Sequence, residues 1–354
     1  MAQEKPAEQK MDFEAYDPPS TLVVPENKIT RAKFPFIDIH NHQAYMTSPG
    51  TLAKLIEEMD KLNMGVMINL SGRGFRGSRD HLERSMDTIN RFYPKRFVLF
   101  TNVDFSNMDQ PEWQARTVKQ LEDDVRRGAM GLKIYKSLGM NNRDSKGNRI
   151  AVDDPRIDPI WAKCGELNIP VLIHTADPKS FWDPMDATNE RWLELKTHPR
   201  RQRSDTDPAP WAQLIQEQHN VFKKHPKTKF INAHMGWYPN DLKKLSELLE
   251  AMPNMYVEIG AVIAELGRQP RTARDFMIKY QDRILFGKDS WVPEEYETYF
   301  RVLETADEYF PYHKRYHAFW RMYGLELPDE VLKKIYYKNA LKLLPKVDKT
   351  QFPK

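Results

Sequence analysis

Two histidines separated by one residue, His40 and His42, follow a short apolar run near the start of the chain. Side chains alternate between the two faces of a strand, so both imidazoles would point the same way. Neutral imidazoles held at this spacing can bind one cation between them, and histidine is the commonest metal ligand among side chains. A His-x-His pair taken alone is equally compatible with a polar strand end. A metal site therefore requires further ligands elsewhere in the chain.

Four later residues with metal-binding or acid–base side chains also stand in or directly after apolar segments. They are Lys133, His174, His234 and Asp289. With the first pair they make four imidazoles and one carboxylate, a nitrogen and oxygen ligand set suited to zinc or a similar divalent ion. A lone histidine at a strand end is more often a hydrogen-bonded structural residue. Four of the ten histidines at such ends, together with the aspartate, favour a metal site.

The segments that must position these residues alternate between strand-like and helical patterns. Eight short segments are apolar on both faces, as buried parallel strands are. They cover residues 36–40, 65–70, 96–103, 131–135, 170–174, 229–234, 255–259 and 283–287. Helical patterns cover residues 51–62, 81–92 with Asp80 as cap, 241–252, 271–280 and 329–344. The alternation predicts a (β/α)8 TIM barrel. An open doubly wound sheet is less favoured because no Gly-x-Gly-x-x-Gly follows an early strand.

In a barrel, the carboxyl ends of the strands surround one mouth, where active sites are built. Long connections follow the predicted fourth, fifth and seventh strands, at residues 136–154, 175–210 and 260–270. The second is rich in arginine and tryptophan, and we expect it to cover the mouth and select the substrate. Aromatic stacking and arginine–carboxylate pairing would suit a sugar acid or an aromatic acid.

Composition limits the other function classes. The chain has 54 basic and 50 acidic residues, so its charge argues little for nucleic-acid binding. No apolar stretch approaches the roughly 20 residues needed to cross a membrane. The single Cys164, expected on the buried side of a helix, excludes an intramolecular disulfide and a thiolate zinc site. We therefore expect a small-molecule substrate rather than nucleic acid or a membrane, and homo-oligomerisation stays open.

The chain divides into a disordered or extended segment over residues 1–33, a barrel domain over residues 34–346 and a tail over residues 347–354. Residues 1–7 are polar and resemble the mature end left after removal of a signal peptide. We expect an exported, periplasmic protein, with a disordered cytoplasmic tail as the alternative interpretation.

The order His-x-His, Lys, His, His, Asp over eight βα units resembles the amidohydrolase superfamily. More narrowly, the chain resembles the amidohydrolase-related group that includes aminocarboxymuconate-semialdehyde decarboxylase. That group commonly ends with a segment like residues 327–340, Leu-Pro-Asp-Glu-Val-Leu-Lys-Lys-Ile-Tyr-Tyr-Lys-Asn-Ala. The resemblance extends over about residues 36–344. It implies a TIM-barrel enzyme that depends on a metal.

By this resemblance, His40, His42, His174 and Asp289 would hold the catalytic ion, and His234 would face the substrate. The resemblance implies one divalent ion, zinc, with manganese or iron as alternatives.

Lys133 stands where binuclear relatives carry a carboxylated lysine that bridges two ions. We favour a single ion, in which case Lys133 offers its ammonium to a substrate carboxylate or is a structural charge. Lys288 departs from many relatives, which have a small residue before the aspartate. Strand alternation would turn it away from the metal, although its charge could lower the basicity of Asp289.

The resemblance and the residues together predict a hydrolase that acts on an ester, a lactone or an amide of a carboxylated small molecule. A divalent ion lowers the pKa of its water, Asp289 could move the proton, and His234 could polarise the scissile carbonyl. Tyr135, Arg143 and Arg268 are candidate substrate-binding residues, or else packing and solvated charges.

A metal-dependent non-oxidative decarboxylase or hydratase is the first alternative, with Asp289 or His234 moving a proton at carbon. Retention of His-x-His together with Lys133 favours hydrolysis, because some decarboxylase relatives replace the first histidine by a carboxylate. A barrel that has lost catalysis and only binds a ligand is the second alternative. The remaining histidines are expected on the surface, with His313 and His317 on one helical face.

Overall fold

The computed structural model describes residues 12–74 and 77–353 of the chain. The polar stretch at residues 1–7, interpreted above as the end left by signal removal, lies outside the described residues, as do residues 8–11, 75–76 and 354. Within the described part, no helix combines the length and apolar composition that crossing a membrane would require.

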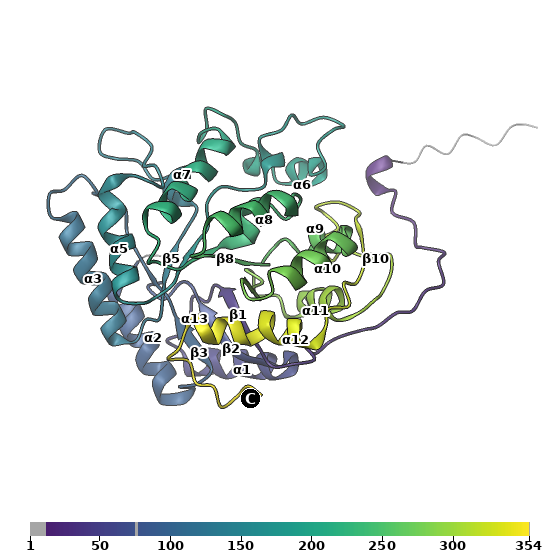
Figure 1. Ribbon diagram of the computed structural model, residues 1–354, viewed down its shortest axis with the longest axis horizontal. Coiled ribbons are helices and arrows are strands. Elements are labelled where there is room, and N and C mark those ends of the chain that lie inside the picture. The colour runs from purple at the N-terminus through teal and green to yellow at the C-terminus, as the bar shows by residue number, and fades with distance from the viewer. Residues whose placement is uncertain (1–11, 75–76, 354) are drawn as a thin grey trace, which may run out of the picture.

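Short parallel strands form the centre of the molecule, with helices around them (Figure 1). The strands are β1 (Phe36–Asn41), β2 (Met64–Asn69), β3 (Phe97–Leu99), β4 (Thr101–Asn102), β5 (Leu132–Ile134), β6 (Val171–Ile173), β7 (Phe230–Asn232), β8 (Met255–Glu258) and β9 (Ile284–Leu285). β3 and β4 are two halves of one strand interrupted at Phe100, whose N–H bonds to the carbonyl of Asn69 at 3.0 Å. All eight predicted strands are therefore confirmed.

The ring of strands closes between β1 and the end of β9. The N–H of Ile39 donates to the carbonyl of Phe286 at 3.0 Å, and the N–H of Asp289 donates to the carbonyl of His40 at 2.7 Å. Asn41 and Asp289 also form a parallel bridge. These bonds complete the predicted eight-stranded TIM barrel.

Helices surround the barrel and also lie in the connections at its mouth. They are α1 (Pro49–Leu62), α2 (Arg79–Phe92), α3 (Trp113–Arg127), α4 (Ser137–Met140), α5 (Asp158–Glu166), α6 (Trp192–Thr197), α7 (Trp211–Lys224), α8 (Leu242–Ala251), α9 (Ile263–Arg268), α10 (Pro270–Lys279), α11 (Tyr296–Glu304), α12 (Asp329–Lys333) and α13 (Asn339–Leu343). A π-helical turn joins the last two, so the predicted C-terminal helix is continuous. Cys164 is buried in α5, as predicted. The predicted cap of α2 was wrong, because the side chain of Ser78 accepts the N–H of His81 and Asp80 lies in the first turn.

The three long connections predicted on the mouth side contain the short helices α4, α6 and α9. A fourth insertion was not predicted. Between α11 and α12 the chain forms an antiparallel pair, β10 (Phe310–Pro311) and β11 (Arg321–Met322). We call residues 310–322 the hairpin. Its two strands are only two residues long, which is too short for a recognisable alternating pattern in the sequence.

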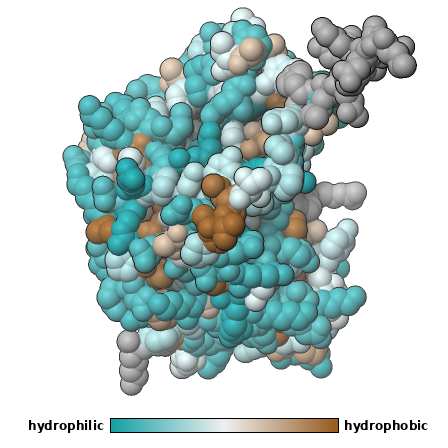
Figure 2. Space-filling view, turned by 90° about the vertical axis from the view of Figure 1, so that its right-hand side faces the viewer, coloured by the Kyte–Doolittle hydropathy of each residue, from teal (hydrophilic) through white to brown (hydrophobic). Residues whose placement is uncertain are grey.

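Residues 12–33 form an extended arm that runs outside the barrel (Figure 1). Polar contacts attach it, because Arg321 Nη2 donates to Asp17 Oδ1 at 2.6 Å and the N–H of Asn27 donates to Asp307 Oδ2 at 2.7 Å. Leu22 and Val23 on the arm are exposed. Figure 2 views the molecule from this side, which is mostly hydrophilic, with an apolar patch near its centre and smaller apolar areas around it. The arm is thus held by polar contacts rather than by burial of these two side chains.

An aromatic cluster packs where the ring of strands closes. Phe286 is fully buried, with ring centroids 4.8 Å from Phe36, 6.1 Å from Phe300 and 5.5 Å from Tyr336. Its N–H donates to the carbonyl of Ile335 at 3.0 Å. One side chain therefore connects β1, the last strand, α11 and the C-terminal helix.

We expect Phe286→Ala to lower the free energy of unfolding by about 3–5 kcal/mol, because a buried ring is replaced by a cavity. Phe92→Ala is the matched control, since this ring on α2 is 44% exposed. It should change the free energy of unfolding by less than about 0.5 kcal/mol. Thermal denaturation followed by circular dichroism compares the variants, and equal melting temperatures would contradict the importance of the cluster.

Candidate metal centre and substrate cavity

Three of the predicted ligands meet at the mouth of the barrel. His40 Nε2 lies 3.3 Å and His42 Nε2 lies 3.6 Å from the same atom, Asp289 Oδ1. The ligand atoms of these residues, which we call the ligand cluster, lie within 4.8 Å of one another. β1 leads to both histidines, and the bridge between Asn41 and Asp289 brings the aspartate beside them. Closure of the barrel therefore assembles the cluster.

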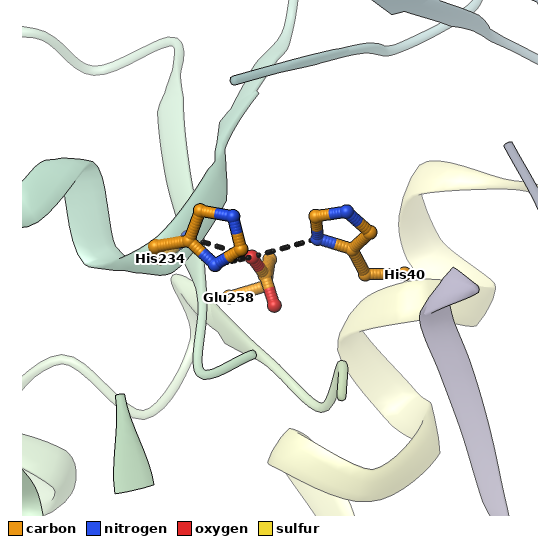
Figure 3. A group of neighbouring side chains, drawn as sticks. All are labelled: His40, His234 and Glu258. Carbon is orange, nitrogen blue, oxygen red and sulfur yellow. Dashed lines mark hydrogen bonds and ion pairs between the residues drawn. The ribbon is translucent and has the colours of Figure 1, made fainter. Parts of the chain in front are cut away.

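A buried carboxylate beside the cluster orients His40 (Figure 3). Glu258 Oε1 lies 3.0 Å from His40 Nδ1 and accepts the N–H of His234 at 2.6 Å, while Oε2 accepts the N–H of Gly260 at 2.6 Å. A carboxylate only accepts, so His40 carries its proton on Nδ1 and leaves Nε2 bare towards Asp289. His40, His234 and Glu258 also lie close enough to hold an ion. Because N–H donors already occupy both oxygens of Glu258, we assign it the orienting role.

A second residue orients His42. Ser71 Oγ lies 2.8 Å from His42 Nδ1 and 2.8 Å from the hydroxyl of Tyr135, which donates to the carbonyl of Leu70 at 3.3 Å. Because the hydroxyl of Tyr135 donates to Leu70, it accepts from Ser71, and Ser71 in turn accepts from His42 Nδ1. The proton of His42 is therefore on Nδ1, and its Nε2 is unprotonated. Sequence reasoning missed both Ser71 and Glu258. Their position at or just after the carboxyl end of a barrel strand is the signal that could have found them.

His234 sits in a left-handed turn. The four residues from His234 to Trp237 all have positive φ, between 52° and 62°. The left-handed conformation costs about 1–2 kcal/mol for each non-glycine residue. The turn places His234 Nδ1 2.7 Å from the carbonyl of Gly260, so this nitrogen donates and Nε2 is bare. The ring stacks on Trp237 at 4.6 Å and borders the cavity described below.

His174, the fourth predicted ligand, lies beside the ligand cluster rather than inside it. Its Nδ1 is 3.3 Å from His234 Nε2, and the two rings meet edge to face at 4.4 Å. Its Nε2 is buried and has no hydrogen-bond partner among the residues that the structure describes. An unpaired buried imidazole nitrogen is costly and is consistent with a ligand position. Ligation by His174 stays a prediction.

Lys133 is buried next to the cluster, with its Nζ 3.4 Å from His40 Nε2. Burial lowers the pKa of Lys133 to about 8, although the nearby carboxylates of Asp289 and Glu258 raise it. The lysine therefore lies within reach of whatever binds at the cluster. Its predicted roles, as a partner of a substrate carboxylate or as a bridging group, stay predictions.

The protonation states of the cluster suit a metal. Burial, followed by the charge of Lys133, lowers the pKa of His42 to about 4 and that of His40 well below its usual value. Burial raises the pKa of Asp289, but His40, His234, His42 and Lys133 outweigh this effect and hold it below its usual range. At neutral pH the cluster offers two neutral imidazoles and a carboxylate. This donor set fits a divalent ion such as zinc.

A cavity of about 180 Å³ opens beside these residues, bordered by His174, His234 and Asp289. The connection after β6 contributes Asp177, Arg191, Glu194 and Arg201, and the hairpin contributes Lys314, Tyr316 and His317. The connection therefore borders the mouth, as expected. A larger cavity of about 650 Å³ lies along α10 and contains none of these side chains. The smaller cavity is the candidate site because His174, His234 and Asp289 border it, although it is not the larger of the two.

The structure does not bring two of the predicted substrate-binding residues to this cavity. Arg143 is exposed and donates to the carbonyl of Met140 at 2.9 Å. Arg268 pairs with Glu190 at 3.0 Å and lies 4.0 Å from the centre of the Trp320 ring. Tyr135, the third, does lie at the site, with its ring 5.7 Å from that of His42.

Two of the histidines expected on the surface, His219 and His317, are buried, and His313 is half-buried. His313 and His317 lie in the hairpin rather than on a helix, and His317 is buried because the hairpin folds over the cavity. His219 is buried on the inner face of α7. Lys288 turns away from the cluster, as predicted, and donates to Glu295 at 2.5 Å.

We expect Glu258→Gln to weaken zinc binding by about 10- to 100-fold, because an amide would turn its NH₂ towards an N–H donor and release His40. Glu217→Gln is the matched control, since Glu217 is also buried but pairs with Arg149 away from the site. Competition against a fluorescent zinc chelator measures both affinities. Wild-type affinity in Glu258→Gln would contradict the orienting role.

A family model described as amidohydrolase matches residues 103–346. No curated protein sequence matches the chain. Among solved structures, an uncharacterised TIM-barrel protein from Bordetella bronchiseptica is similar, with a TM-score of 0.53 and 15% identity over 88% of this chain and 98% of that one. A dihydroxybenzoic acid decarboxylase from a Polaromonas species, with bound manganese and an inhibitor, has a TM-score of 0.54 and 16% identity over 88% and 97% of the two chains. A 4-oxalomesaconate hydratase from Rhodopseudomonas palustris has a TM-score of 0.52 and 14% identity over 88% and 95%.

The structural likenesses, at such low identity, establish the fold. The family match includes His174, His234 and Asp289 but begins after β1, so it is the structure that adds His40 and His42 to the same site. Because that match covers more than half of the sequence, the chain belongs to the amidohydrolase family and is an enzyme of the amidohydrolase superfamily with a site suited to a divalent metal.

Proposed function

We propose that the protein is a metal-dependent hydrolase that acts on an ester, a lactone or an amide of a carboxylated small molecule. The observation that carries this proposal is the convergence of the bare Nε2 atoms of His40 and His42 on the carboxylate of Asp289 beside an open cavity. We propose zinc as the ion, with manganese or iron as alternatives, and His174 as a further ligand.

Asp289 is the residue suited to move a proton. When bound, a divalent ion lowers the pKa of water so that a nucleophile is available near neutral pH. The Asp289 side chain is 36% exposed and borders the cavity, whereas Glu258 is fully buried. Its carboxylate can accept a proton from the attacking water and return it to the leaving oxygen or nitrogen as the scissile bond breaks.

His234 acts on the substrate side of the same reaction. Its Nδ1 donates to Gly260, so the neutral ring offers only a lone pair on Nε2. In this form Nε2 can accept a hydrogen bond or a proton from a bound substrate or water. Once protonated there, the ring can stabilise an oxyanion. The left-handed turn places the ring of His234 at the border of the cavity.

A decarboxylase or hydratase on the same scaffold is the second candidate. Although Lys133 favours hydrolysis when judged from the sequence, its position also suits this reaction, because a buried ammonium beside the ligand cluster can bind a reacting carboxylate. Asp289 or His234 would then move a proton to or from carbon. The solved structures of similar fold include a decarboxylase and a hydratase, so this architecture accommodates both reactions.

A panel of esters, lactones, amides and aromatic carboxylic acids, assayed with the zinc-loaded and manganese-loaded protein, tests the proposal. We expect hydrolysis of one of the first three classes, loss of turnover on chelation and recovery when the metal is restored. His234→Asn should lower kcat by about 100-fold or more at unchanged metal content, because it removes an acid–base group.

His225→Asn is the matched control, since His225 pairs with Asp158 at 2.9 Å at the end of α7 and should leave kcat unchanged. Release of CO₂, or addition of water to a double bond, without hydrolysis would replace the first candidate by the second. A purified protein that binds no metal and turns over nothing would overturn both.

A further inference from the structure

The hairpin brings to the cavity side chains that the barrel strands do not supply. Lys314, Tyr316 and His317 border the same cavity as His234 and Asp289. They come from an insertion between α11 and α12, whereas the candidate chemical groups stand at strand ends. The hairpin is therefore placed to contact the part of a substrate that does not react.

The hairpin is held firmly in this position. The guanidinium groups of Arg268 and Arg191 lie 4.0 Å and 5.4 Å from the centre of the Trp320 ring, within range of cation–π attraction. The N–H of Tyr312 donates to the carbonyl of Trp320 at 3.1 Å and closes the turn. On the outer side, Arg321 donates to Asp17 of the arm at 2.6 Å. Contacts on both sides preorganise the side chains between residues 312 and 320.

Most cations at the cavity are already neutralised by the chain. Lys136 pairs with Asp177. Arg201 pairs with Glu194 at 2.5 Å, and Arg191 pairs with the same glutamate at 2.7 Å and also with Glu265. These side chains form the walls of the cavity but have little charge left for a ligand.

Lys314 is the exception. Its ion pair, with Glu295 Oε2, spans 4.0 Å, which is too long for a hydrogen bond, and the same oxygen accepts Lys288 Nζ at 2.5 Å. The side chain of Lys314 is only 18% exposed, so water compensates it poorly. His317 cannot share its role, because burial, followed by the charge of Arg191, lowers the pKa of His317 to about 2 and keeps it neutral. Lys314 is thus the hairpin's positive group at the cavity.

Taking this cavity as the substrate site of the proposed function, we infer that Lys314 binds a carboxylate of the substrate other than the reacting group. The substrate is then a small organic acid whose reacting group lies at the ligand cluster. The cavity of about 180 Å³ corresponds to roughly six water molecules, enough for one small ring or a short chain. A carboxylate there would form the charge-assisted hydrogen bond that Glu295 does not.

Equilibrium binding of two probes tests this assignment without requiring turnover. Isophthalate carries two carboxylates on one ring and benzoate carries one, so isothermal titration of the zinc-loaded full chain measures the gain from the second. We expect isophthalate to bind about tenfold or more tightly than benzoate to the wild type. Lys314→Gln should remove that gain, and Lys314→Arg should keep most of it.

Arg315→Gln is the matched control, because Arg315 lies next in the hairpin, is 65% exposed and does not border the cavity. It should leave the gain intact. No gain in the wild type, or equal loss in Arg315→Gln and Lys314→Gln, would overturn the assignment. Because binding is measured apart from catalysis, a protein that hydrolyses nothing can still show the Lys314 effect, and an active hydrolase can still lack it.

Discussion

The hydrogen bond from the N–H of Asp289 to the carbonyl of His40 is the contact on which the rest of the site depends. It completes the barrel by joining the first strand to the segment that follows the last strand. It also joins the backbones of two members of the ligand cluster directly. Phe286 and its aromatic neighbours exclude water from this closure. The packing that stabilises the fold therefore also sets the distance between the imidazole of His40 and the carboxylate of Asp289. A change that loosens this packing is expected to disturb the ligand cluster as well.

A second constraint is backbone strain at the mouth. Non-glycine residues with positive φ follow four successive strands, namely Ala176 after β6, His234 after β7, Ala261 after β8 and Asp289 after β9. Such conformations cost about 1–2 kcal/mol each and persist only where the surroundings enforce them. The buried carboxylate of Glu258 is one such enforcing group, because it accepts the N–H groups of His234 and Gly260 while it holds His40.

The parts of the molecule that the sequence predicts are those with local signals. Buried parallel strands appear in the sequence as apolar runs, so all eight strands could be predicted. The ligand candidates could be recognised because each stands at or just after the end of such a run. Glu258 and Ser71 also stand at or just after strand ends, but that position does not reveal an orienting role, because an orienting hydrogen bond is defined by its three-dimensional partner. Arg268 illustrates the converse. Its charge suggested substrate binding, but its guanidinium group pairs with Glu190 and packs on the ring of Trp320. Both partners lie far from Arg268 in the sequence.

The charges at the mouth favour an anionic ligand independently of any single wall residue. Glu258 and Asp289 supply two carboxylates, Lys133 and a divalent ion, once bound, would supply three positive charges, and burial keeps His40 and His42 neutral. One positive charge is left over in a buried, weakly screened place, where it interacts strongly with a ligand. The walls cannot neutralise it, because Asp177 and Glu194 are already paired with lysine and arginine. With an ion bound as proposed, an acid that enters the cavity would therefore offset this charge, whereas a neutral molecule of the same shape would leave it buried.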